Sequence, residues 1–487
     1  MQSPALLTDL YQLTMAQGYW RSGLADREAV FHLTFRRCPF DGEYAIACGL
    51  ATAIQWLSQF QFEGEDLGYL AQQTGSNGQP LFDDAFLDFL RPQRLACDLD
   101  ALPEGTLVFP HEPLVRVRGP LWQAQVIETA LLNIINFQTL IATKAARICL
   151  AAEGDPIIDF GLRRAQGIDG GLAASRAAFI GGCHGTSNVL AGKSFGIPIR
   201  GTHAHSWVMA FGDELAAFRS YAAAMPNNCV FLVDTYDTLR GVENAIVVGR
   251  ELWASGHDLL GIRLDSGDLA QLSKTARAML DAAGFTGTKI VASSDLDEHE
   301  IARLKRAGAT IDIWGVGTRL VTGHDQPALG GVYKLSALRD EAGQWQHRVK
   351  RSEVTIKVSD PGILQVRRLR SGGRLLADAL YDELVGFDTT SLISPDRTET
   401  WTIPAGAESS DLLVPVMRRG RAVGRLPEPV AIREFAASQL AELPDVTRRL
   451  DNPEPYFVGH EPRLAALKES LLSQVEKQLR CFNWQEP

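Results

Sequence analysis

The chain has no excess of positive charge, although its 487 residues include 48 lysines and arginines. The 58 aspartates and glutamates give a net charge of −10. Without an overall basic field, we expect neither a nucleic acid nor an anionic membrane as a partner. Any anionic ligand would have to be held by local groups.

Long apolar runs are also missing. No segment approaches the ~18 residues that cross a bilayer, and the first residues, "MQSPALLTDLYQL", show no basic segment followed by an apolar one. We therefore expect no export signal and no membrane anchor.

Cysteines at metal-binding or redox spacing are absent too. The seven cysteines are scattered singly, with no Cys-x-x-Cys pair and an odd total. The simplest interpretation is a cytoplasmic protein with reduced thiols. A hydrophobic content of 45% is ordinary for a soluble globular protein, and the length allows two or three domains.

A repeated pattern of short apolar runs and amphipathic helices fills residues 141–330. Examples are "PIIDFGLRRA" before "GLAASRAAFIGG", "CVFLVDTYDT" before "GVENAIVVGRELWAS" and "LLGIRLDSGD" before "LAQLSKTARAMLDAAG". Apolar runs bounded by turn residues and separated by helices indicate parallel strands buried on both faces. This pattern predicts an α/β barrel or an open doubly wound sheet.

The flanking segments show other patterns. Residues 1–140 mix strand-like stretches such as "AVFHLTFRRC" with helices such as "ATAIQWLSQF", which predicts an α+β domain. In residues 331–487, "GVYKLSALRDEAGQWQHRVKRSEVTIKV" alternates with the period of two that is typical of hairpins. We expect these strands to return to the sheet of the first domain, with a helical tail from about Glu428 onward.

Polar and small residues stand where the predicted strands end. In parallel α/β folds the loops after these ends carry the functional site. The residues concerned are Asp159, Phe160, His203, His205, Asp234, Arg263, Asp265, Ser293, Ser294, Gly315 and Gly317.

The pair His203 and His205, in "IPIRGTHAHSWVMAF", has three interpretations: a metal site, a nucleophile, or a packed polar strand end. A metal site needs further ligands at other strand ends, and the remaining histidines do not stand there. On the residues alone, the other two interpretations remain open.

The segment "RLDSGDL" contains two carboxylates around a Ser-Gly turn. Asp265 and Asp268 could accept hydrogen bonds from sugar hydroxyls or bind Mg²⁺, and Arg263 offers a planar donor fork to an anion. Asp268 could instead cap the next helix. The two interpretations are compatible.

Two further segments suggest binding of a phosphate or a flat ring. Gly315, Gly317 and Thr318 in "WGVGTRL", with Ser293 and Ser294 of the preceding predicted strand, could form a phosphate cradle. In "DFGLRRAQG", aromatic Phe160 lies close to Arg163 and Arg164, which suits a flat anionic ring, although a plain core role for Phe160 is equally compatible.

The segment "GTSNVLAGKSFG" does not have phosphate-loop spacing. Six residues separate Gly185 from Gly192 where a P-loop has four. We expect Lys193 and Ser194 to lie at the end of a helix.

Seven motifs, in the same order, resemble the nicotinate phosphoribosyltransferase family. They are "TDLYQLTMAQGY", "DFGLRRAQG", "GTSNVLAG", "GTHAHSWVMAF", "RLDSGDL", "SSDLDE" and "GVGT" followed by "PALGGVYKL". The resemblance implies an irregular α/β barrel of the type II phosphoribosyltransferase kind, with an additional α+β domain. It also implies an enzyme of the ligase and glycosyltransferase class in NAD biosynthesis.

The family joins nicotinate to phosphoribosyl pyrophosphate, giving nicotinate mononucleotide and pyrophosphate. ATP hydrolysis is coupled through a phosphorylated histidine, and Mg²⁺ is required. Displacement of pyrophosphate develops positive charge on the ribose and negative charge on the leaving group, which calls for cationic side chains, backbone donors and a metal ion. The residue types at the predicted strand ends suit this chemistry.

The resemblance also implies roles for individual residues. His205 is the implied phosphohistidine and Asp234 a ligand of Mg²⁺ or its water shell. Asp265 would contact the ribose hydroxyls, with Arg263 beside it as a catalytic residue. The implied substrate-binding residues are Tyr11, Asp9, Phe160, Arg163, Ser187, Ser293, Gly315, Gly317 and Thr318.

Tyr11 would come from the neighbouring subunit and cover the pyridine ring that stacks on Phe160, so the resemblance implies a homodimer with shared sites. A helix packed within its own domain is the alternative for this N-terminal segment. Ser187 is neutral and can donate to a carboxylate, whereas related nicotinamide enzymes carry an aspartate there, so nicotinate is favoured over nicotinamide. The other functions considered are a quinolinate or nicotinamide phosphoribosyltransferase, a metal-dependent barrel hydrolase and a catalytically silent ligand-binding protein.

Overall fold

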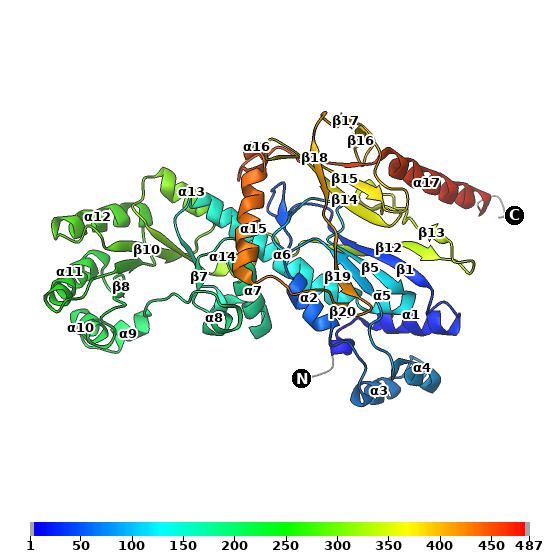
Figure 1. Cartoon of the computed structure of the whole chain (residues 1–487). Coiled ribbons are helices and arrows are strands. Elements are labelled where there is room, and N and C mark those ends of the chain that lie inside the picture. Colours follow the sequence, from blue (N-terminus) through cyan, green and yellow to red (C-terminus); the bar gives the residue numbers. More distant parts are fainter. Residues whose placement is uncertain (1–3, 483–487) are drawn as a thin grey trace. The chain divides into compact units, whose positions relative to one another are not determined.

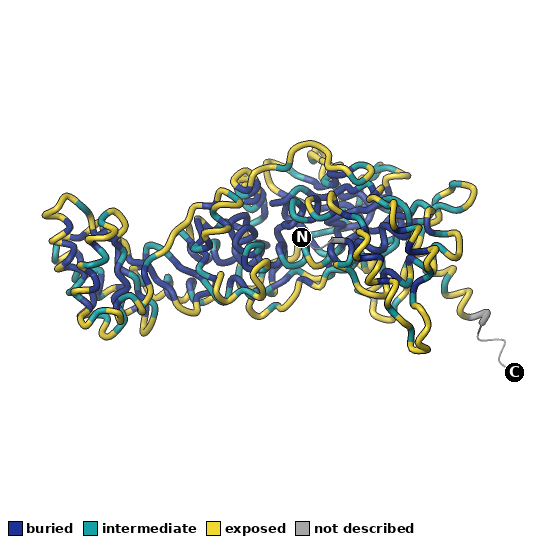
Figure 2. Tube along the Cα trace, turned by 90° about the horizontal axis from the view of Figure 1, so that it is seen from below, coloured by how far each residue is buried: buried dark blue, intermediate teal, exposed yellow. Residues whose placement is uncertain are grey.

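The computed structural model describes residues 4–482, apart from the side chains of residues 4, 355 and 480–482. The described chain divides into two compact units. The first comprises residues up to 139, residues 328–427 and residues from 435 onward; the second comprises residues 140–327 and 428–434. Buried residues concentrate inside each unit (Figure 2). Among the described residues, no helix combines the length and apolar character needed to cross a membrane.

The first unit contains a seven-stranded antiparallel sheet built from distant parts of the chain. Its strands, in spatial order, are β13 (Trp345–His347), β12 (Val332–Arg339), β1 (Glu28–Thr34), β5 (Val115–Pro120), β3 (Asp98–Ala101), β19 (Val414–Arg418) and β20 (Arg421–Ala422). The central strand β1 is buried on both faces, since all five interior residues are buried. Phe31 of β1 stacks on Tyr333 of β12 with ring centroids 4.9 Å apart, so burial of aromatic surface joins segments about 300 residues apart in sequence.

This unit also contains a six-stranded sheet formed by residues 364–411 and 457–460. Its strands, in spatial order, are β17 (Thr400–Thr402), β16 (Ser391–Ile393), β21 (Phe457–His460), β15 (Arg374–Asp382), β14 (Leu364–Ser371) and β18 (Glu408–Asp411). A small sheet pairs β2 (Ala45–Ile46) with β4 (Leu107–Val108). The helices of this unit are α1 (Leu10–Arg21), α2 (Leu50–Leu57), α3 (Gly64–Ala71), α4 (Asp84–Leu90), α5 (Leu121–Val126), α15 (Pro429–Glu442), α16 (Asp445–Arg448) and α17 (Pro462–Phe482), with α6 (Glu128–Ala151) and α15 extending across the division between the units.

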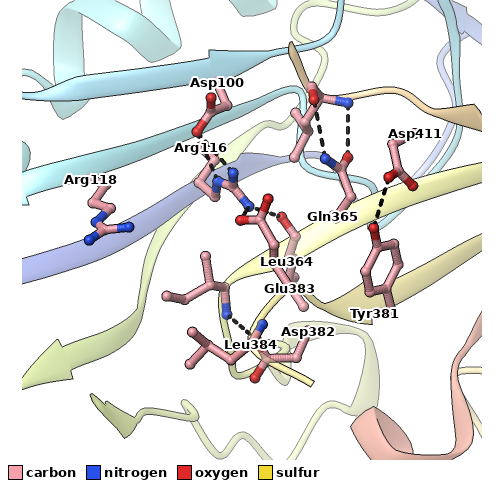
Figure 3. A network of polar contacts seen from close by, with 12 residues as sticks. Asp100, Arg116, Arg118, Leu364, Gln365, Tyr381, Asp382, Glu383, Leu384 and Asp411 are labelled. Carbon is pink, nitrogen blue, oxygen red and sulfur yellow. Dashed lines mark hydrogen bonds and ion pairs between the residues drawn. The ribbon is translucent and has the colours of Figure 1, made fainter. Parts of the chain in front are cut away.

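A buried arginine links the two larger sheets of the first unit (Figure 3). Arg116 of β5 donates to Asp100 of β3 (2.9 Å) and to the carbonyl of Leu364 in β14 (3.0 Å). It also pairs with Glu383 at 2.7 Å. Because a buried charge is costly unless it is fully hydrogen-bonded, this network fixes how β5 faces β14.

The second unit contains a six-stranded parallel sheet (Figure 1). Its strands, in spatial order, are β7 (Gly185–Thr186), β6 (Ile157–Asp159), β11 (Ile313–Val316), β10 (Lys289–Ser294), β9 (Gly261–Leu264) and β8 (Val230–Leu232). The helices that alternate with them are α7 (Ile168–Ile180), α8 (Val189–Phe195), α9 (His205–Met209), α10 (Glu214–Ala224), α11 (Thr238–Ala254), α12 (Leu269–Ala282), α13 (Glu298–Arg306) and α14 (Thr318–Val321), with a 3-10 turn η2 (Leu162–Arg164) after β6. The strand–helix alternation and the mixed α/β fold are thus as expected.

The hydrogen bonding of this sheet leaves β7 and β8 at its edges. On the β7 side, Thr186 forms a parallel bridge with Ile199. On the β8 side, the backbone N–H of Leu232 donates to the ring of His203. Among the described residues, no strand ladder joins these two edges, so the structure shows a mixed α/β arrangement around a six-stranded parallel sheet.

Polar residues between the strands and the following helices act as N-caps. Their side chains accept hydrogen bonds from backbone N–H groups of the first turn, which are otherwise unpaired. These residues are Asn188, Asp213, Asp237, Asp268 and Asp297. The capping interpretation of Asp268 is confirmed, and Lys193 lies in the last turn of α8 as expected.

Candidate active site

Phe160 follows β6 and lies against the neighbouring strand. Its backbone N–H donates to the carbonyl of Val316 (2.8 Å), and a Cβ added to Gly315 would lie 2.5 Å from the Phe160 ring. Only glycine therefore permits the ring to pack on β11. The guanidinium carbon of Arg263 lies 5.5 Å from the ring centroid, within the range of a cation–π contact. Phe160 is thus a half-exposed ring beside a cation, and not a buried core residue.

Arg263 of β9 is held by three side chains. Its Nε donates to Ser293 Oγ (2.8 Å), one Nη to Thr202 Oγ1 (2.8 Å) and the other Nη to Asp265 Oδ1 (3.1 Å). The Ser293 hydroxyl also donates to Asp265. These bonds hold the guanidinium in place before a ligand binds. Its remaining N–H groups can therefore donate to a ligand without the entropy cost of ordering a long side chain.

Asp265 is ionised in this environment. Burial alone would raise its pKa, but hydrogen bonds from Ser293 and Arg263 and the positive charge of Arg263 hold the pKa below its usual range. An anionic carboxylate at a strand end can accept hydrogen bonds from ligand hydroxyls.

His205 is the first residue of α9 and remains partly accessible. Its Nδ1 lies 3.1 Å from Thr235 Oγ1, and its Nε2 lies 3.7 Å from Asp265 Oδ2. The side chain is 39% exposed. A partly exposed imidazole that is held at Nδ1 can act as a nucleophile.

His203, two residues earlier, differs from His205 in every respect. It is buried, its Nε2 accepts from the N–H of Leu232 (3.3 Å), and its ring packs 4.9 Å from that of Tyr221. Burial lowers its pKa to about 4, so it is neutral at physiological pH. With Nε2 accepting a backbone hydrogen bond and Nδ1 facing the carbonyl of Ala204 (3.4 Å), His203 has no lone pair left for a metal ion.

Asp234 adds a carboxylate beside Asp265. Its Oδ2 accepts from the N–H of Asp265 (2.8 Å) and from Ser266 Oγ (2.7 Å), whereas its Oδ1 is buried without a hydrogen-bond partner. Within residues 4–482, no group of three or more His, Cys, Asp or Glu side chains is arranged to hold a metal ion. The metal-dependent hydrolase therefore lacks its ligand set.

A cavity of about 230 Å³ brings most of the expected residues together. It is lined by Phe160, Arg163, Arg164, Arg263, Asp265, Ser293, Ser294, Asp295, Gly315, Gly317 and Thr318. Ser294 has a φ of 141°, which L-residues rarely adopt, and such strain concentrates at functional sites. Three guanidinium groups and the Gly-x-Gly loop make the cavity suitable for phosphate groups.

Known proteins resemble this chain over nearly its whole length. Residues 6–136 match the nicotinate phosphoribosyltransferase N-terminal domain, residues 156–360 the nicotinate phosphoribosyltransferase family and residues 366–468 the C-terminal domain of these enzymes. A nicotinate phosphoribosyltransferase of Bacillus subtilis is 46% identical over 462 residues, which cover 94% of this chain and 92% of the relative. The chain belongs to the nicotinate phosphoribosyltransferase family.

Other relatives support this assignment. The nicotinate phosphoribosyltransferase of Homo sapiens is 37% identical, covering 96% of each chain. The crystal structure of human nicotinic acid phosphoribosyltransferase superposes with a TM-score of 0.84 at 34% identity, over 96% of this chain and 100% of that one. A nicotinate-nucleotide pyrophosphorylase from Pyrococcus furiosus, at 22% identity and a TM-score of 0.69 over 90% of this chain and 95% of that one, shares the fold.

The remaining expected residues of this family member lie in other places. Ser187 follows β7 and lines a larger cavity of about 1330 Å³ that also includes Phe160 and Thr202. Asp9 and Tyr11 belong to the first unit, at the start of α1, where Asp9 accepts from Thr129 Oγ1 (2.7 Å). Tyr11 is 48% exposed, so it is not a core residue of its own chain.

The first unit contains a pocket rich in basic residues that was not predicted from the sequence. It is lined by His32, Thr34, Arg36, His111, Val332, Lys334, Ile356, Lys357, Val358, Ser359, Asp360 and Leu364. Its acid, Asp360, is already paired with Lys468 (2.7 Å), and burial lowers the pKa of Lys334, as do the charges of Lys350 and Arg36. Only the basic residues of "HRVKRSEVTIKV" hinted at it, because the other segments join through tertiary structure.

Proposed function

We propose that this family member transfers the phosphoribosyl group of phosphoribosyl pyrophosphate to nicotinate, giving nicotinate mononucleotide and pyrophosphate for NAD biosynthesis. The observation that carries the proposal is the juxtaposition of Phe160, Arg263, Asp265 and Ser293 in one cavity with the Gly-x-Gly loop. A flat ring with a carboxylate, a ribose and a phosphate each find a complementary surface there. The sequence motifs and the relatives support the same reaction.

Each side chain has a role in this proposal. The pyridine ring stacks on Phe160, and Ser187 and Arg263 donate to its carboxylate. Asp265 accepts from the ribose hydroxyls. The 5′-phosphate and the pyrophosphate are held by the set Ser293, Gly315, Gly317, Thr318 and Arg163. The backbone donors of the Gly-x-Gly loop and the hydrogen-bonded Ser293 hydroxyl are held by the fold, so they would stabilise the charge that develops on the leaving pyrophosphate with little reorganisation.

We further propose that ATP is a co-substrate and that His205 accepts its phosphoryl group at Nε2. The support is the partial exposure of the His205 side chain and the contact of Nδ1 with Thr235. A proton on Nδ1 would leave the lone pair on Nε2, the nitrogen that would attack the phosphoryl donor. The phosphohistidine would form when Nε2 displaces ADP from the γ-phosphorus.

Mg²⁺ is the expected metal, and Asp234 is its expected protein ligand. The buried, unpartnered Oδ1 of Asp234 fits this role, since a carboxylate oxygen suits this hard cation. Mg²⁺ commonly uses one or two carboxylates together with substrate phosphates and waters, which agrees with the small number of acids nearby. When bound, the ion would neutralise charge on the leaving pyrophosphate.

The barrel and the dimer belong to the same proposal. The bond from Leu232 to His203, and the bridge from Thr186 to Ile199, support a sheet that curls toward an irregular barrel across the gap between β8 and β7. In a homodimer with shared sites, the partner's exposed N-terminal segment would complete the nicotinate pocket. The exposure of Tyr11 supports this arrangement.

The test is an assay of the purified chain with phosphoribosyl pyrophosphate and Mg²⁺, with and without ATP, and with nicotinate, nicotinamide or quinolinate as the acceptor. We expect nicotinate mononucleotide from nicotinate, and stimulation by ATP. His205→Ala should remove the stimulation and the ATPase activity while the chain remains folded. Product from quinolinate or nicotinamide alone would replace the proposed substrate, and no product from any acceptor would favour a ligand-binding protein.

A further inference from the structure

Asp159, the last residue of β6, carries a carboxylate that is 3% exposed and joins three segments of the second unit. Its Oδ1 accepts from the N–H of Gly161 (2.8 Å). Its Oδ2 accepts from Ser175 Oγ of α7 (2.8 Å) and from Thr186 Oγ1 of β7 (2.7 Å). Asp159 does not line the cavity of about 230 Å³ that contains Phe160, Arg263 and Asp265.

The two oxygens of a carboxylate match these three donors. All three are neutral groups that donate, and burial of a charge is costly unless hydrogen bonds compensate it. The two oxygens of a carboxylate accept all three bonds, whereas an asparagine would turn an NH₂ group toward at least one of these donors. The cost of burying this charge indicates that the position of its partners matters.

The hydrogen bonds to the Asp159 carboxylate lie next to Phe160 and Ser187, the two residues that we place in the nicotinate pocket. Asp159 and Thr186 are paired residues at the ends of adjacent parallel strands, and the residues that follow them are Phe160 and Ser187. The N–H of Ser187 also donates to the Asp159 carbonyl (2.9 Å). One side-chain bond and one backbone bond thus fix the separation of Phe160 and Ser187 at their base.

The same network continues on the other side of Ser187. The N–H of Asn188 donates to Thr186 Oγ1 (3.0 Å), and its amide donates to Ser175 Oγ (3.2 Å). Asn188 also caps α8 by accepting from the N–H of Ala191 (3.2 Å). Ser187 therefore lies between two residues that are anchored to the Asp159 carboxylate.

We propose that Asp159 is a positioning residue that sets the separation of Phe160 and Ser187 and thereby the affinity and selectivity for the pyridine substrate. It acts through these two residues and does not touch the substrate. This inference rests on the proposed function, because it assigns Phe160 and Ser187 to the nicotinate pocket.

The experiment compares steady-state kinetics of four variants in the full chain. Asp159→Asn and Thr186→Val disturb the network, whereas Thr186→Ser keeps the hydroxyl. Asp312→Asn is the matched control, because Asp312 is also an aspartate that accepts a backbone bond at a sheet end, from Ile290 (2.9 Å), but lies before β11, at the opposite end of the sheet.

We expect Asp159→Asn and Thr186→Val to raise the KM for nicotinate about tenfold, the effect of losing one or two such bonds, and to reduce the preference for nicotinate over nicotinamide. The KM for phosphoribosyl pyrophosphate should change less than about twofold, since losses confined to one pocket leave distant contacts intact. Thr186→Ser and Asp312→Asn should keep the wild-type KM for both substrates, whatever their thermal stability.

Two results would overturn the inference. One is a wild-type KM for nicotinate in folded Asp159→Asn and Thr186→Val. The other is an equal rise of the KM for nicotinate and the KM for phosphoribosyl pyrophosphate in these two variants. If general destabilisation caused that rise, Asp312→Asn would show it as well. Should Asp159→Asn fail to fold, the contrast between Thr186→Val and Thr186→Ser decides. Failure of the proposed function differs from both, because the wild-type chain itself would then not use nicotinate.

Discussion

The contact between His205 and Thr235 leads to a quantitative prediction about phosphoryl transfer. Thr235→Val preserves the shape of the side chain and removes the hydroxyl that lies 3.1 Å from Nδ1 of His205. As Nε2 attacks the γ-phosphorus, positive charge develops on the imidazole, and the hydrogen bond from Nδ1 to the hydroxyl becomes charge-assisted. The bond is therefore stronger in the transition state than in the ground state, which is the condition for a contribution to the rate.

The magnitude follows from the difference between the two kinds of hydrogen bond. A neutral bond contributes about 1 kcal/mol and one to a charged group about 1.5–3 kcal/mol, so the differential loss is about 0.5–2 kcal/mol. Such a loss corresponds to a roughly 2- to 30-fold slower phosphorylation. Because the side chain of His205 is 39% exposed, water will replace part of the lost bond, and we expect a value near the lower end.

The assay is the single-turnover formation of acid-labile, alkali-stable label from γ-labelled ATP. Thr235→Ser, which keeps the hydroxyl, is the matched control and should label at nearly the wild-type rate. Phosphoribosyl transfer measured without ATP should be unchanged in both variants. Thr235 does not line the cavity of about 230 Å³ in which we propose that this transfer takes place. Labelling of Thr235→Val at the wild-type rate, or an equal loss in ATP-free transfer, would refute the argument.

Three further predictions concern other residues. Ser187→Asp should weaken nicotinate use by a few kcal/mol, because two carboxylates would meet in a pocket of low effective dielectric; an unchanged kcat/KM for nicotinate would remove Ser187 from the pocket. Mixed dimers of Tyr11→Ala and His205→Ala chains, verified by tagged pull-down, should regain ATP-stimulated transfer because one of their two sites is intact; if they show no ATP stimulation, the shared-site proposal fails. The lowered pKa of Asp265 contributes stability that is fully present above the ordinary value of 3.8 and is lost as the pH falls through the folded-state value. Asp265→Asn should therefore flatten the acid limb of the free energy of unfolding measured by urea titration, and an unchanged limb would contradict this.

The local features of the second unit could be predicted from the sequence. Apolar runs such as "CVFLVD" became strands, and Asp268 became an N-cap, because both outcomes depend on neighbours within a few residues. The polar residues at the strand ends could also be foreseen, since the carboxyl ends of parallel strands must share one edge. Family membership followed from the order of the motifs.

The partners within the site could not be predicted in this way. Asp159 and Thr186 are 27 residues apart, and His205 and Thr235 are 30 residues apart. Their hydrogen bonds depend on which strands become neighbours and in which register. The chain order β6, β7, β8, β9, β10, β11 gives no direct sign that β11 lies beside β6.

The two histidines show most clearly where the sequence stops being sufficient. His203 and His205 are separated by one residue, yet His203 is buried and accepts a bond from β8, whereas His205 begins α9 and has a partly exposed side chain. The sequence by itself determined the strand–helix pattern, the caps and the family, because these depend on local spacing. Only the tertiary structure decided which histidine is buried, which carboxylate supports the pocket and that β12 lies beside β1, because burial and hydrogen bonding depend on residues distant in the chain.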